Sequence, residues 1–400
     1  MVNMHLTPEQ SEFRDMLKDF VSNEIKPKSI KSDRLQPFDK PLMENLVVRL
    51  SELGLRSLNL SEEAGGVGAD LLTSCIILEE LAIGDVDIAI TLGHTALLSK
   101  LLFDKWMTKK QRESYISDFL NNHSFHLAYA GHDPEASHGW NYHDEVQGEI
   151  SHNPEVIKQG ANWNLNGSVN FVTNAPIASL FIVPTQFENQ IISLVVPENS
   201  PGLKVGEPIR TTGKNQTRWH HGTMSLVDFS DCKVPLENQI NFMDSGRDFE
   251  IRNLIQRAAI NLGVGQVAFE TAIEYTKIRR QGGVDIIEHQ AIGKMIADMA
   301  IKLEHARAMI WKAAWFIDNP SETSGGEKTQ TPLHIIASSF TAEAIHEVTH
   351  LAAECFGAMA VMRDMPLQKY VEDAFIFLNS DTNDLSTKLR ITETIIEYQR

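Results

Sequence analysis

Two histidines and a glutamate in the last quarter of the chain have the spacing of a zinc site. The run His346-Glu347-Val348-Thr349-His350 places both imidazoles on one face of a predicted helix, with Glu347 available as a general base. A chain with 15 histidines can contain this five-residue pattern by chance, and the glycine-histidine tail of the extended zinc-protease pattern is absent. The apolar face of this helix is explained by packing, so we predict a packed helix and no metal site.

The composition excludes several classes of protein. Asp and Glu number 53 against 36 Lys and Arg, and the net charge of −17 argues against nucleic acid or an anionic membrane as the main partner. The three widely spaced cysteines predict reduced thiols in a cytoplasmic protein. The first residues do not have the pattern of a signal peptide, and no uncharged run reaches the about 18 residues of a membrane span.

The first part of the chain is predicted to be helical. Thr7-Pro8-Glu9-Gln10 and Thr108-Lys109-Lys110-Gln111 are capping boxes that begin helices. Apolar residues recur at helical spacing over 13–25 and again over 42–53, where Gly54 ends the second helix. We predict an N-terminal helical domain over residues 1–123.

Short β-rich runs follow, and long helical patterns come after them. Asn166-Gly167 stands between two such runs and predicts a two-residue hairpin. We predict an antiparallel β-barrel or sandwich over residues 124–242. Helical patterns over 251–280, 290–315 and 333–356 then predict a C-terminal four-helix bundle over residues 243–400. The fold class is therefore mostly α with a central β domain, since 400 residues exceed what one core usually serves.

Several stretches in this order match a known pattern. Residues 55–82 (LRSLNLSEEAGGVGADLLTSCIILEELA) contain a glycine-rich turn that leads to LEELA. Residues 166–174 are similar to a strand with the pattern N-G…W-I-T-N. Residues 275–290 together with 296–315 are similar to helices with the pattern Y-x-x-x-R…LADMA. The chain as a whole resembles the acyl-CoA dehydrogenase family of flavoenzymes. The resemblance implies that family's fold, a homodimer or homotetramer, and FAD bound between the β domain and the bundle, partly across a subunit interface.

The resemblance also implies the catalytic residues. In this family a carboxylate removes the α-proton of an acyl thioester while the β-hydride passes to flavin N5. The base usually stands fifteen residues after a proline, which from Pro366 gives Asp381, and Lys388 stands at the family's arginine seven residues later. A second branch of the family places its base at the position of Asn253, beside an arginine at the position of Arg252. Asp381 is therefore the implied base, and Arg252 and Lys388 the implied substrate-binding residues.

The cofactor contacts implied by the resemblance are partly substituted. Two positions are substituted: His132 replaces a hydroxyl residue near the pyrimidine, and Phe171 replaces a tryptophan. Four positions are retained, namely Thr173, Arg279, Gln290 and Gly357. Arg279 and Gln290 are expected near the adenine half of FAD across the dimer. Gly357 is the first glycine of a turn whose later glycines are alanines here, which narrows the approach of backbone to a dinucleotide.

Three functions are compatible with this pattern. The first is α,β-dehydrogenation of an acyl thioester bound to CoA or to a carrier protein, with electrons passed to a partner. The second is an oxidase of the nitroalkane type, which also uses an aspartate base, or a monooxygenase of the same fold. Ile286-Ile287-Glu288-His289-Gln290 is similar to the nitroalkane oxidases. The third is a flavin-poor binding or scaffolding protein, which the substituted glycines would suit.

Overall fold

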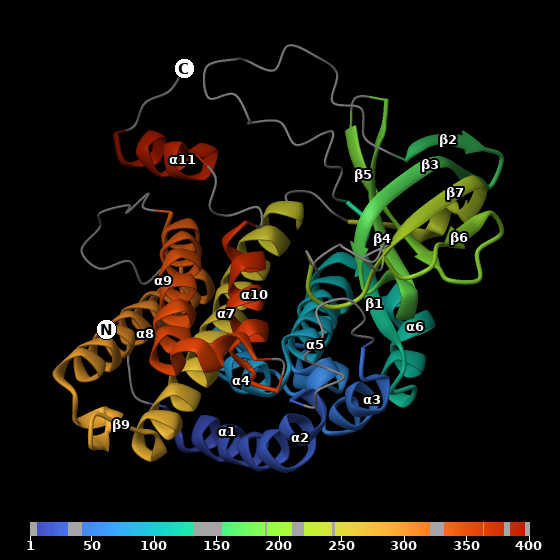
Figure 1. Cartoon of the computed structure of the whole chain (residues 1–400). Helices are drawn as coiled ribbons and strands as arrows, with labels where there is room; N and C mark the ends of the chain where they lie inside the picture. Colours follow the sequence, from blue (N-terminus) through green and yellow to red (C-terminus); the bar gives the residue numbers. More distant parts are fainter. Residues whose placement is uncertain are drawn as a thin grey trace.

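Helices and strands form two bodies that lie side by side (Figure 1). The computed structural model describes residues 6–30, 42–131, 154–188, 190–209, 220–241, 245–320, 332–362, 364–379 and 385–396. The N-terminal helices are α1 (Pro8–Phe20), which continues through a π-helical turn (Val21–Ile25) into α2 (Lys26–Ser29), then α3 (Glu44–Glu52), α4 (Leu71–Gly84), α5 (Val86–Ser99) and α6 (Lys109–Asn121). The later helices are α7 (Ser245–Ile278), α8 (Gln290–Asp318), α9 (Leu333–Phe356), α10 (Leu367–Leu378) and α11 (Leu385–Ile396).

The helix ends follow the local sequence. Thr7 Oγ1 accepts a hydrogen bond from the backbone N–H of Gln10 (3.2 Å), and the Gln10 carboxamide oxygen accepts one from the N–H of Thr7 (2.9 Å). Thr108 and Gln111 repeat this arrangement, so both predicted capping boxes are confirmed. Gly54 follows α3 with a φ of +86°, as predicted for a residue that ends a helix.

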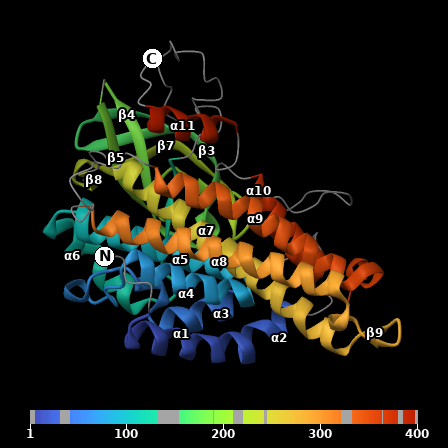
Figure 2. The same cartoon turned by 90° about the vertical axis from the view of Figure 1, so that its left-hand side faces the viewer.

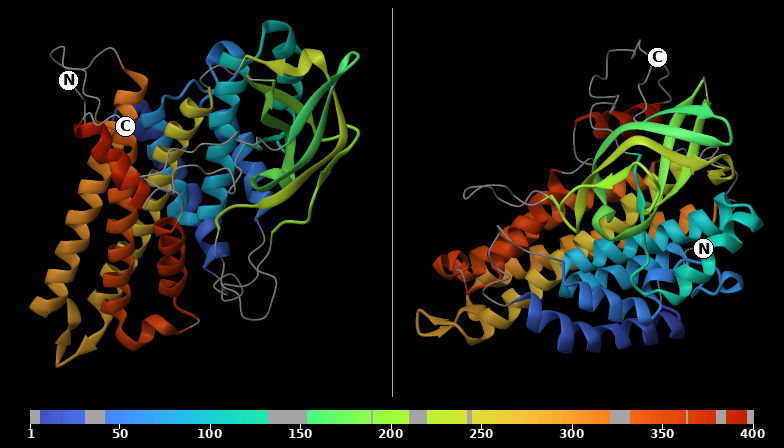
Figure 3. Two further views of the ribbon diagram at one scale, coloured as in Figure 1. Left: turned by 90° about the horizontal axis from the view of Figure 1, so that it is seen from above. Right: turned by 90° about the vertical axis from the view of Figure 1, so that its right-hand side faces the viewer.

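The two helical regions share one hydrophobic core. Residues of α4, α5, α7, α8 and α9 meet in it, among them Leu81, Leu92, Ile255, Leu303 and Ile345. The stretch Val86–Trp106 is long and apolar enough to cross a membrane by length and composition, but 94% of its most apolar window is buried in the protein. Figure 3, seen from above, shows the blue and cyan helices between the orange and red C-terminal helices and the green strands. The N-terminal helices therefore form the layer that both neighbours pack against.

The strands form a sandwich of two four-stranded sheets and not a closed barrel. One sheet has the order β1 (His126–Tyr129), β4 (Ala178–Phe187), β5 (Gln190–Pro197), β8 (Gln239–Ile240). The other has the order β2 (Glu155–Gln159), β3 (Asn162–Thr173), β7 (Met224–Pro235), β6 (Leu203–Val205). The prediction of an all-antiparallel domain is wrong at one pairing, because β1 runs parallel to β4. A further two-stranded ribbon, β9 (Arg280–Gln281) and β10 (Val284–Asp285), joins α7 to α8.

The predicted hairpin at Asn166-Gly167 is wrong. Both residues lie inside β3, where the register against β7 shifts between Leu165 and Gly167. Gly167 has a φ of +129°, and Asn166 Oδ1 accepts a hydrogen bond from the backbone N–H of Asp231 (2.8 Å). The positive φ that Asn-Gly provides for a tight turn is used here for a bulge in one long strand. The turn between β2 and β3 lies instead at Gly160.

The close contact between α7 and α4 at Gly263 can be tested by substitution. A Cβ atom at this position would overlap the carbonyl oxygen of Glu79 and lie 2.8 Å from Ala82 Cβ. We expect Gly263→Ala to lower the free energy of unfolding by about 1–3 kcal/mol in urea titrations, because two packed backbones must separate. The matched control is Gly293→Ala in α8, where a Cβ meets nothing within 4 Å and the better helix propensity should add about 0.5–1 kcal/mol. Equal effects of the two substitutions would contradict this packing.

Candidate active site

Buried hydrogen bonds attach the end of β3 and the start of β7 to α5. Asn174 follows β3 in the left-handed conformation, with a φ of +64°, and its Nδ2 donates to the Thr91 carbonyl (2.9 Å) and to Thr95 Oγ1 (3.1 Å). Asn174 N–H donates to the Thr223 carbonyl (2.8 Å), and Gly222 N–H donates to Asp87 Oδ1 (2.8 Å). We call the region where α5, the ends of β3 and β7, α7 and α10 meet the seam; its side chains are His94, Phe171, Thr173, His221, Phe249, Arg257, Asp373 and Phe377.

Phe171 and Thr173 stand at the end of β3 next to these bonds. The register of β3 shifts between Val169 and Val172, and Phe171 has a φ of +58°. Such a φ is an outlier for a bulky residue, and strain of this kind collects at functional sites. The Phe171 side chain remains 37% exposed, while Thr173 pairs with Met224 at the last position of the strand. An aromatic face held outward at a strand end fits a flat, aromatic ligand such as an isoalloxazine.

Aromatic rings line the α5 side of the seam. The His94 ring lies 5.6 Å from the Phe249 ring, edge to face, and Phe249 lies 4.6 Å from the Tyr129 ring at the end of β1. Burial, reinforced by the charge of Arg257, lowers the pKa of His94 to about 3. His94 is therefore a neutral imidazole at physiological pH, and no partner within the described chain hydrogen-bonds its buried Nε2.

The α10 side of the seam carries charged residues around one aromatic ring. The Phe377 ring lies 4.3 Å from the His221 ring, and the guanidinium carbon of Arg257 lies 5.6 Å from its centre. Asp373, one turn earlier on α10, accepts a hydrogen bond from Lys369 Nζ (2.6 Å) and lies 3.5 Å from His221 Nε2. Chain elements from three parts of the sequence thus bring a histidine, an arginine and an ion pair to one place.

The sequence prediction missed these residues. The pattern that could have found His221 is the dipeptide His220-His221 directly before a glycine and a β-rich run. Arg257 lies on α7 four residues after Asn253 and so on the same helix face. His94 lies on a helix that is buried on every side, where a polar side chain requires an explanation.

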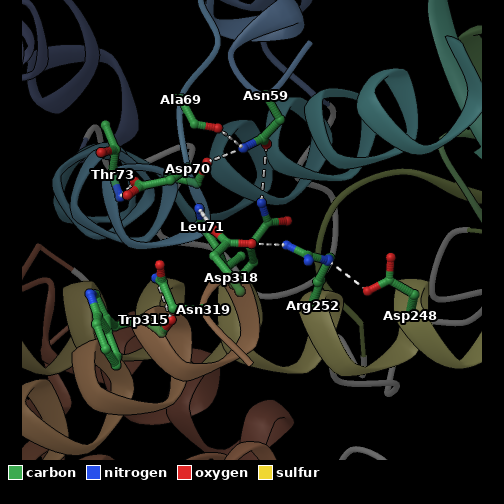
Figure 4. A network of polar contacts seen from close by, with 12 residues as sticks. Asn59, Ala69, Asp70, Leu71, Thr73, Asp248, Arg252, Trp315, Asp318 and Asn319 are labelled. Carbon is green, nitrogen blue, oxygen red and sulfur yellow. Dashed lines mark hydrogen bonds and ion pairs between the residues drawn. The ribbon is translucent and has the colours of Figure 1, made fainter. Parts of the chain in front are cut away.

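Arg252 is engaged in a network that joins three helices (Figure 4). Its guanidinium donates from Nε to Asp248 Oδ1 (2.7 Å) and from Nη1 to Asp318 Oδ1 (2.6 Å). Asp318 also accepts the backbone N–H of Leu71 at the start of α4 (2.7 Å). Burial opposes the charge of Arg252, but Asp318 and Asp248 outweigh it and raise the pKa of the guanidinium. Its observed contacts therefore hold helices together, whereas the resemblance implied substrate binding.

Lys388 lies apart from Arg252. It is exposed on α11 and forms an ion pair with Glu343 of α9. Figure 1 shows α11 as a separate helix above the bundle. The structure therefore does not bring the two predicted substrate-binding residues together. The predicted base Asp381 and the predicted cofactor residue His132 lie outside the described residues.

The end of the helical body away from the seam carries three of the predicted cofactor residues, Arg279, Gln290 and Gly357. Arg279 follows α7 one turn after Tyr275, whose ring stacks on Phe356 at 3.9 Å, and Gly357 follows Phe356. Gln290 begins α8. Figure 2 shows this end, marked by β9, far from the strands. Phe249 at the seam and Tyr275 are 26 positions apart on α7, a rise of about 40 Å. The predicted cofactor residues at this end and Phe171 therefore cannot contact the same part of one ligand within a single chain.

Gly357 has the conformation that requires glycine. Its φ of +57° with ψ of −135° ends α9, and a Cβ there would meet nothing within 4 Å. The neighbouring Ala358 is exposed, and Ala360 is buried. Backbone and open space are thus available beside Gly357, as an approaching dinucleotide requires.

The zinc-like pattern lies on α9 as a packed helix, as predicted. Ile345 and Val348 are buried in the shared core. Glu347 forms an ion pair with Lys302 of α8 (2.6 Å), and His350 Nδ1 lies 2.9 Å from the His346 carbonyl oxygen. Among the residues that the structure describes, no group of three or more His, Cys, Asp or Glu could hold a metal ion.

Known protein families match both helical regions. The model of the acyl-CoA dehydrogenase N-terminal domain matches residues 7–123, and that of the C-terminal domain matches residues 253–377. A short-chain specific acyl-CoA dehydrogenase of Clostridium acetobutylicum is 27% identical over 386 residues, which cover 94% of each chain. The mitochondrial isobutyryl-CoA dehydrogenase of Dictyostelium discoideum is 25% identical over 98% of this chain and 90% of its own.

Solved structures share the fold across nearly the whole chain. Butyryl-CoA dehydrogenase from Megasphaera elsdenii superposes with a TM-score of 0.82 at 24% identity, covering 98% of this chain and 100% of its own. The prolyl acyl carrier protein oxidase AnaB superposes with a TM-score of 0.80 at 20% identity, covering 98% of this chain and 100% of its own. The helix–sandwich–helix arrangement is therefore that of a known fold.

Replacing Arg252 tests whether its contacts are structural. We expect Arg252→Met to lower the free energy of unfolding by about 3–5 kcal/mol, because Asp318 and Asp248 lose their buried partner. The measurement is urea unfolding followed by circular dichroism. The control is Arg14→Met, which removes an exposed pair with Asp15 (3.3 Å) and should cost below about 1 kcal/mol. Unchanged stability of Arg252→Met with a raised substrate KM would instead assign Arg252 to substrate binding.

Proposed function

Because this chain belongs to the acyl-CoA dehydrogenase family of flavin oxidoreductases, we propose that it dehydrogenates an acyl thioester between its α and β carbons with FAD as cofactor. The observation that supports this most is the seam. Here the end of β3, with Phe171 and Thr173, is hydrogen-bonded through Asn174 to α5 and to the start of β7, and His221 just before β7 lies against Phe377 of α10. In the sequence, α10 is followed by the segment with Asp381. The proposed cofactor residues therefore lie in the same region as the helix that precedes the proposed base in the sequence.

The chain offers residues for both ends of FAD. Phe171 would stack on the isoalloxazine, Thr173 would hydrogen-bond its edge, and His132 would lie near the pyrimidine. When bound, FAD supplies the acceptor for the β-hydride at its N5. Arg279, Gln290 and Gly357 would hold the adenine half that belongs to a second subunit.

Asp381 would act as the base that removes the α-proton. An α C–H is a weak acid, so the carboxylate needs a pocket with little water, where its basicity rises. Asp381 follows Phe377 by four residues, and a chain segment of that length spans at most about 14 Å. The Lys388–Glu343 ion pair would hold the following helix on α9, and Arg252 would fix the start of α7.

A homodimer or homotetramer would complete the cofactor site. The separation of about 40 Å along α7 requires a second copy if Arg279 and Phe171 serve one FAD. Exposed apolar side chains near that end, Ile278 (78% exposed) and Val361 (67%), support a covered surface there.

The remaining assignments concern compartment and partners. We propose a cytoplasmic protein, supported by three buried cysteines without disulfides. Burial raises the pKa of Cys232 and of Cys355 to about 11, so neither thiol is activated. The acyl carrier would be CoA or a carrier protein. The electrons would pass to a separate acceptor protein.

Asp381→Asn tests the proposed base. We expect the variant to remain yellow and to lose at least about 100-fold of the rate at which an acyl thioester bleaches the flavin anaerobically, because an amide cannot take the proton. Stopped-flow absorbance measures this rate. The control is Asp384→Asn, which removes a carboxylate from the same segment and should keep the parent rate. An unchanged rate in Asp381→Asn would exclude the proposed base, and bleaching by nitroalkanes alone would assign an oxidase.

Mixed oligomers test the shared cofactor site. We expect Phe171→Ala and Arg279→Ala each to lose FAD, because each removes a contact from every site. Co-expression of the two variants with different tags gives mixed dimers, in which one site takes Phe171 and Arg279 from the chains that retain them and the other site has neither. Purified mixed dimers should therefore regain about half of the flavin absorbance. The control pairs a Phe171→Ala/Arg279→Ala double variant with the parent chain, which leaves every site damaged. Recovery of no flavin in the mixed dimers would show that one chain binds the whole cofactor.

A further inference from the structure

One buried hydroxyl of α5 joins the two strands that lead to the proposed flavin contacts. Thr95 is 0% exposed, and its Oγ1 lies 3.1 Å from Asn174 Nδ2, directly after β3. The same oxygen lies 3.0 Å from Nδ1 of His126, the first residue of β1. Since β1 and β3 belong to different sheets of the sandwich, Thr95 links both sheets through a single atom.

The chemistry of the three groups fixes the direction of each hydrogen bond. Asn174 Nδ2 also lies 2.9 Å from the Thr91 carbonyl oxygen, which can only accept, so this nitrogen is the donor to Thr95 Oγ1 as well. Thr95 Oγ1 accepts that bond and directs its one hydrogen to His126 Nδ1. Burial lowers the pKa of His126 to about 3, so its imidazole is neutral and Nδ1 can accept. The hydroxyl thus acts as donor and acceptor at once, which an alkyl side chain cannot do.

A second buried threonine of this protein makes a different kind of contact. Thr341 in α9 is also 0% exposed, but its Oγ1 donates to the Ala337 carbonyl one turn earlier on the same helix (2.7 Å). Such a bond satisfies the hydroxyl locally and joins no other element. The hydroxyl of Thr95 is instead shared between two strands. Because Thr95 has no exposed surface, it can act on a ligand only through those strands.

Both partners of Thr95 belong to segments that carry proposed flavin contacts. Asn174 directly follows residues 171–173, the end of β3 with the proposed isoalloxazine contacts. His126 begins β1, which leads in the sequence to His132. The register of β3 is irregular next to this end, so its ladder with β7 alone leaves the position of the end less strictly defined. The bonds to Thr95 supply a fixed point that both segments share.

We propose that Thr95 is a positioning residue of the flavin site, whose hydroxyl sets the separation of the two strands that lead to the isoalloxazine contacts. A flat ring system meets contacts from both strands at once only where both strands are held in place, and a site arranged in advance loses less free energy on binding. This inference rests on the proposed function, because it takes residues of β3 and the segment after β1 as the contacts of FAD.

Titration of the flavin-free protein with FAD tests this role without any turnover. We expect Thr95→Val, which keeps the shape and removes both hydrogen bonds, to raise the Kd for FAD about 10-fold and to change the visible circular dichroism of the bound flavin. Thr95→Ser keeps the hydroxyl and should retain most of the affinity and the parent spectrum. The matched control is Thr341→Val, which removes an equally buried hydroxyl and should change neither. His126→Phe breaks only the bond to β1 and should give a smaller rise in Kd, so it serves as a second variant if Thr95→Val does not fold.

Hydrogen exchange measured by mass spectrometry shows whether both strands respond. In the flavin-free protein, Thr95→Val should speed amide exchange over residues 126–130 and 171–175 alike, whereas Thr341→Val should affect neither segment. A Kd for FAD that depends on the Thr95 hydroxyl supports the inference even where no acyl thioester bleaches the flavin and the proposed function fails. An equal Kd and spectrum in the parent and in Thr95→Val, or an equal loss in Thr341→Val, overturns it. Thermal unfolding of each variant establishes that it has folded.

Discussion

The buried hydrogen bonds of Asn174 fix how the β-sandwich lies on the helices. Its carboxamide reaches Thr91 and Thr95 in the middle of α5, a helix that is buried along its whole length. Gly222 makes the second attachment, and its missing side chain permits it, because a Cβ there would lie 3.0 Å from Ile90 Cγ2. The seam exists because these two short backbone segments hold β3 and β7 against a rigid helix.

A second constraint aligns the helices that form the other side of the seam. Arg252 lies between Asp248 and Asp318 and joins α7 to the end of α8, while Asp318 also caps the start of α4. Lys105 adds an ion pair from the N-terminal region to Asp248 (2.8 Å). Because the buried charge of Arg252 depends on its two carboxylate partners, the network sets the position of α7 relative to α4 and α8. Phe249 and Arg257, on the same helix, are positioned with it.

Local sequence predicted the helices well and the site only in part. The capping boxes at Thr7 and Thr108 and the stop at Gly54 depend on neighbouring residues alone, so they could be identified without the fold. Asn166-Gly167 was misread because a bulge and a turn use the same backbone conformation, and only the pairing of β3 with β7 separates them. His94, His221 and Arg257 are far apart in sequence and meet only through packing, so no local pattern could join them.

We propose that a single region, the seam, binds both the flavin and the acyl group. The most direct measurement is a crystal structure of the flavin-loaded protein with a thioether analogue of an acyl thioester. We expect the isoalloxazine against Phe171 and Thr173, with the thioester end of the acyl group beside it at the seam. Flavin bound away from Phe171, or a thioester bound away from the seam, would contradict this.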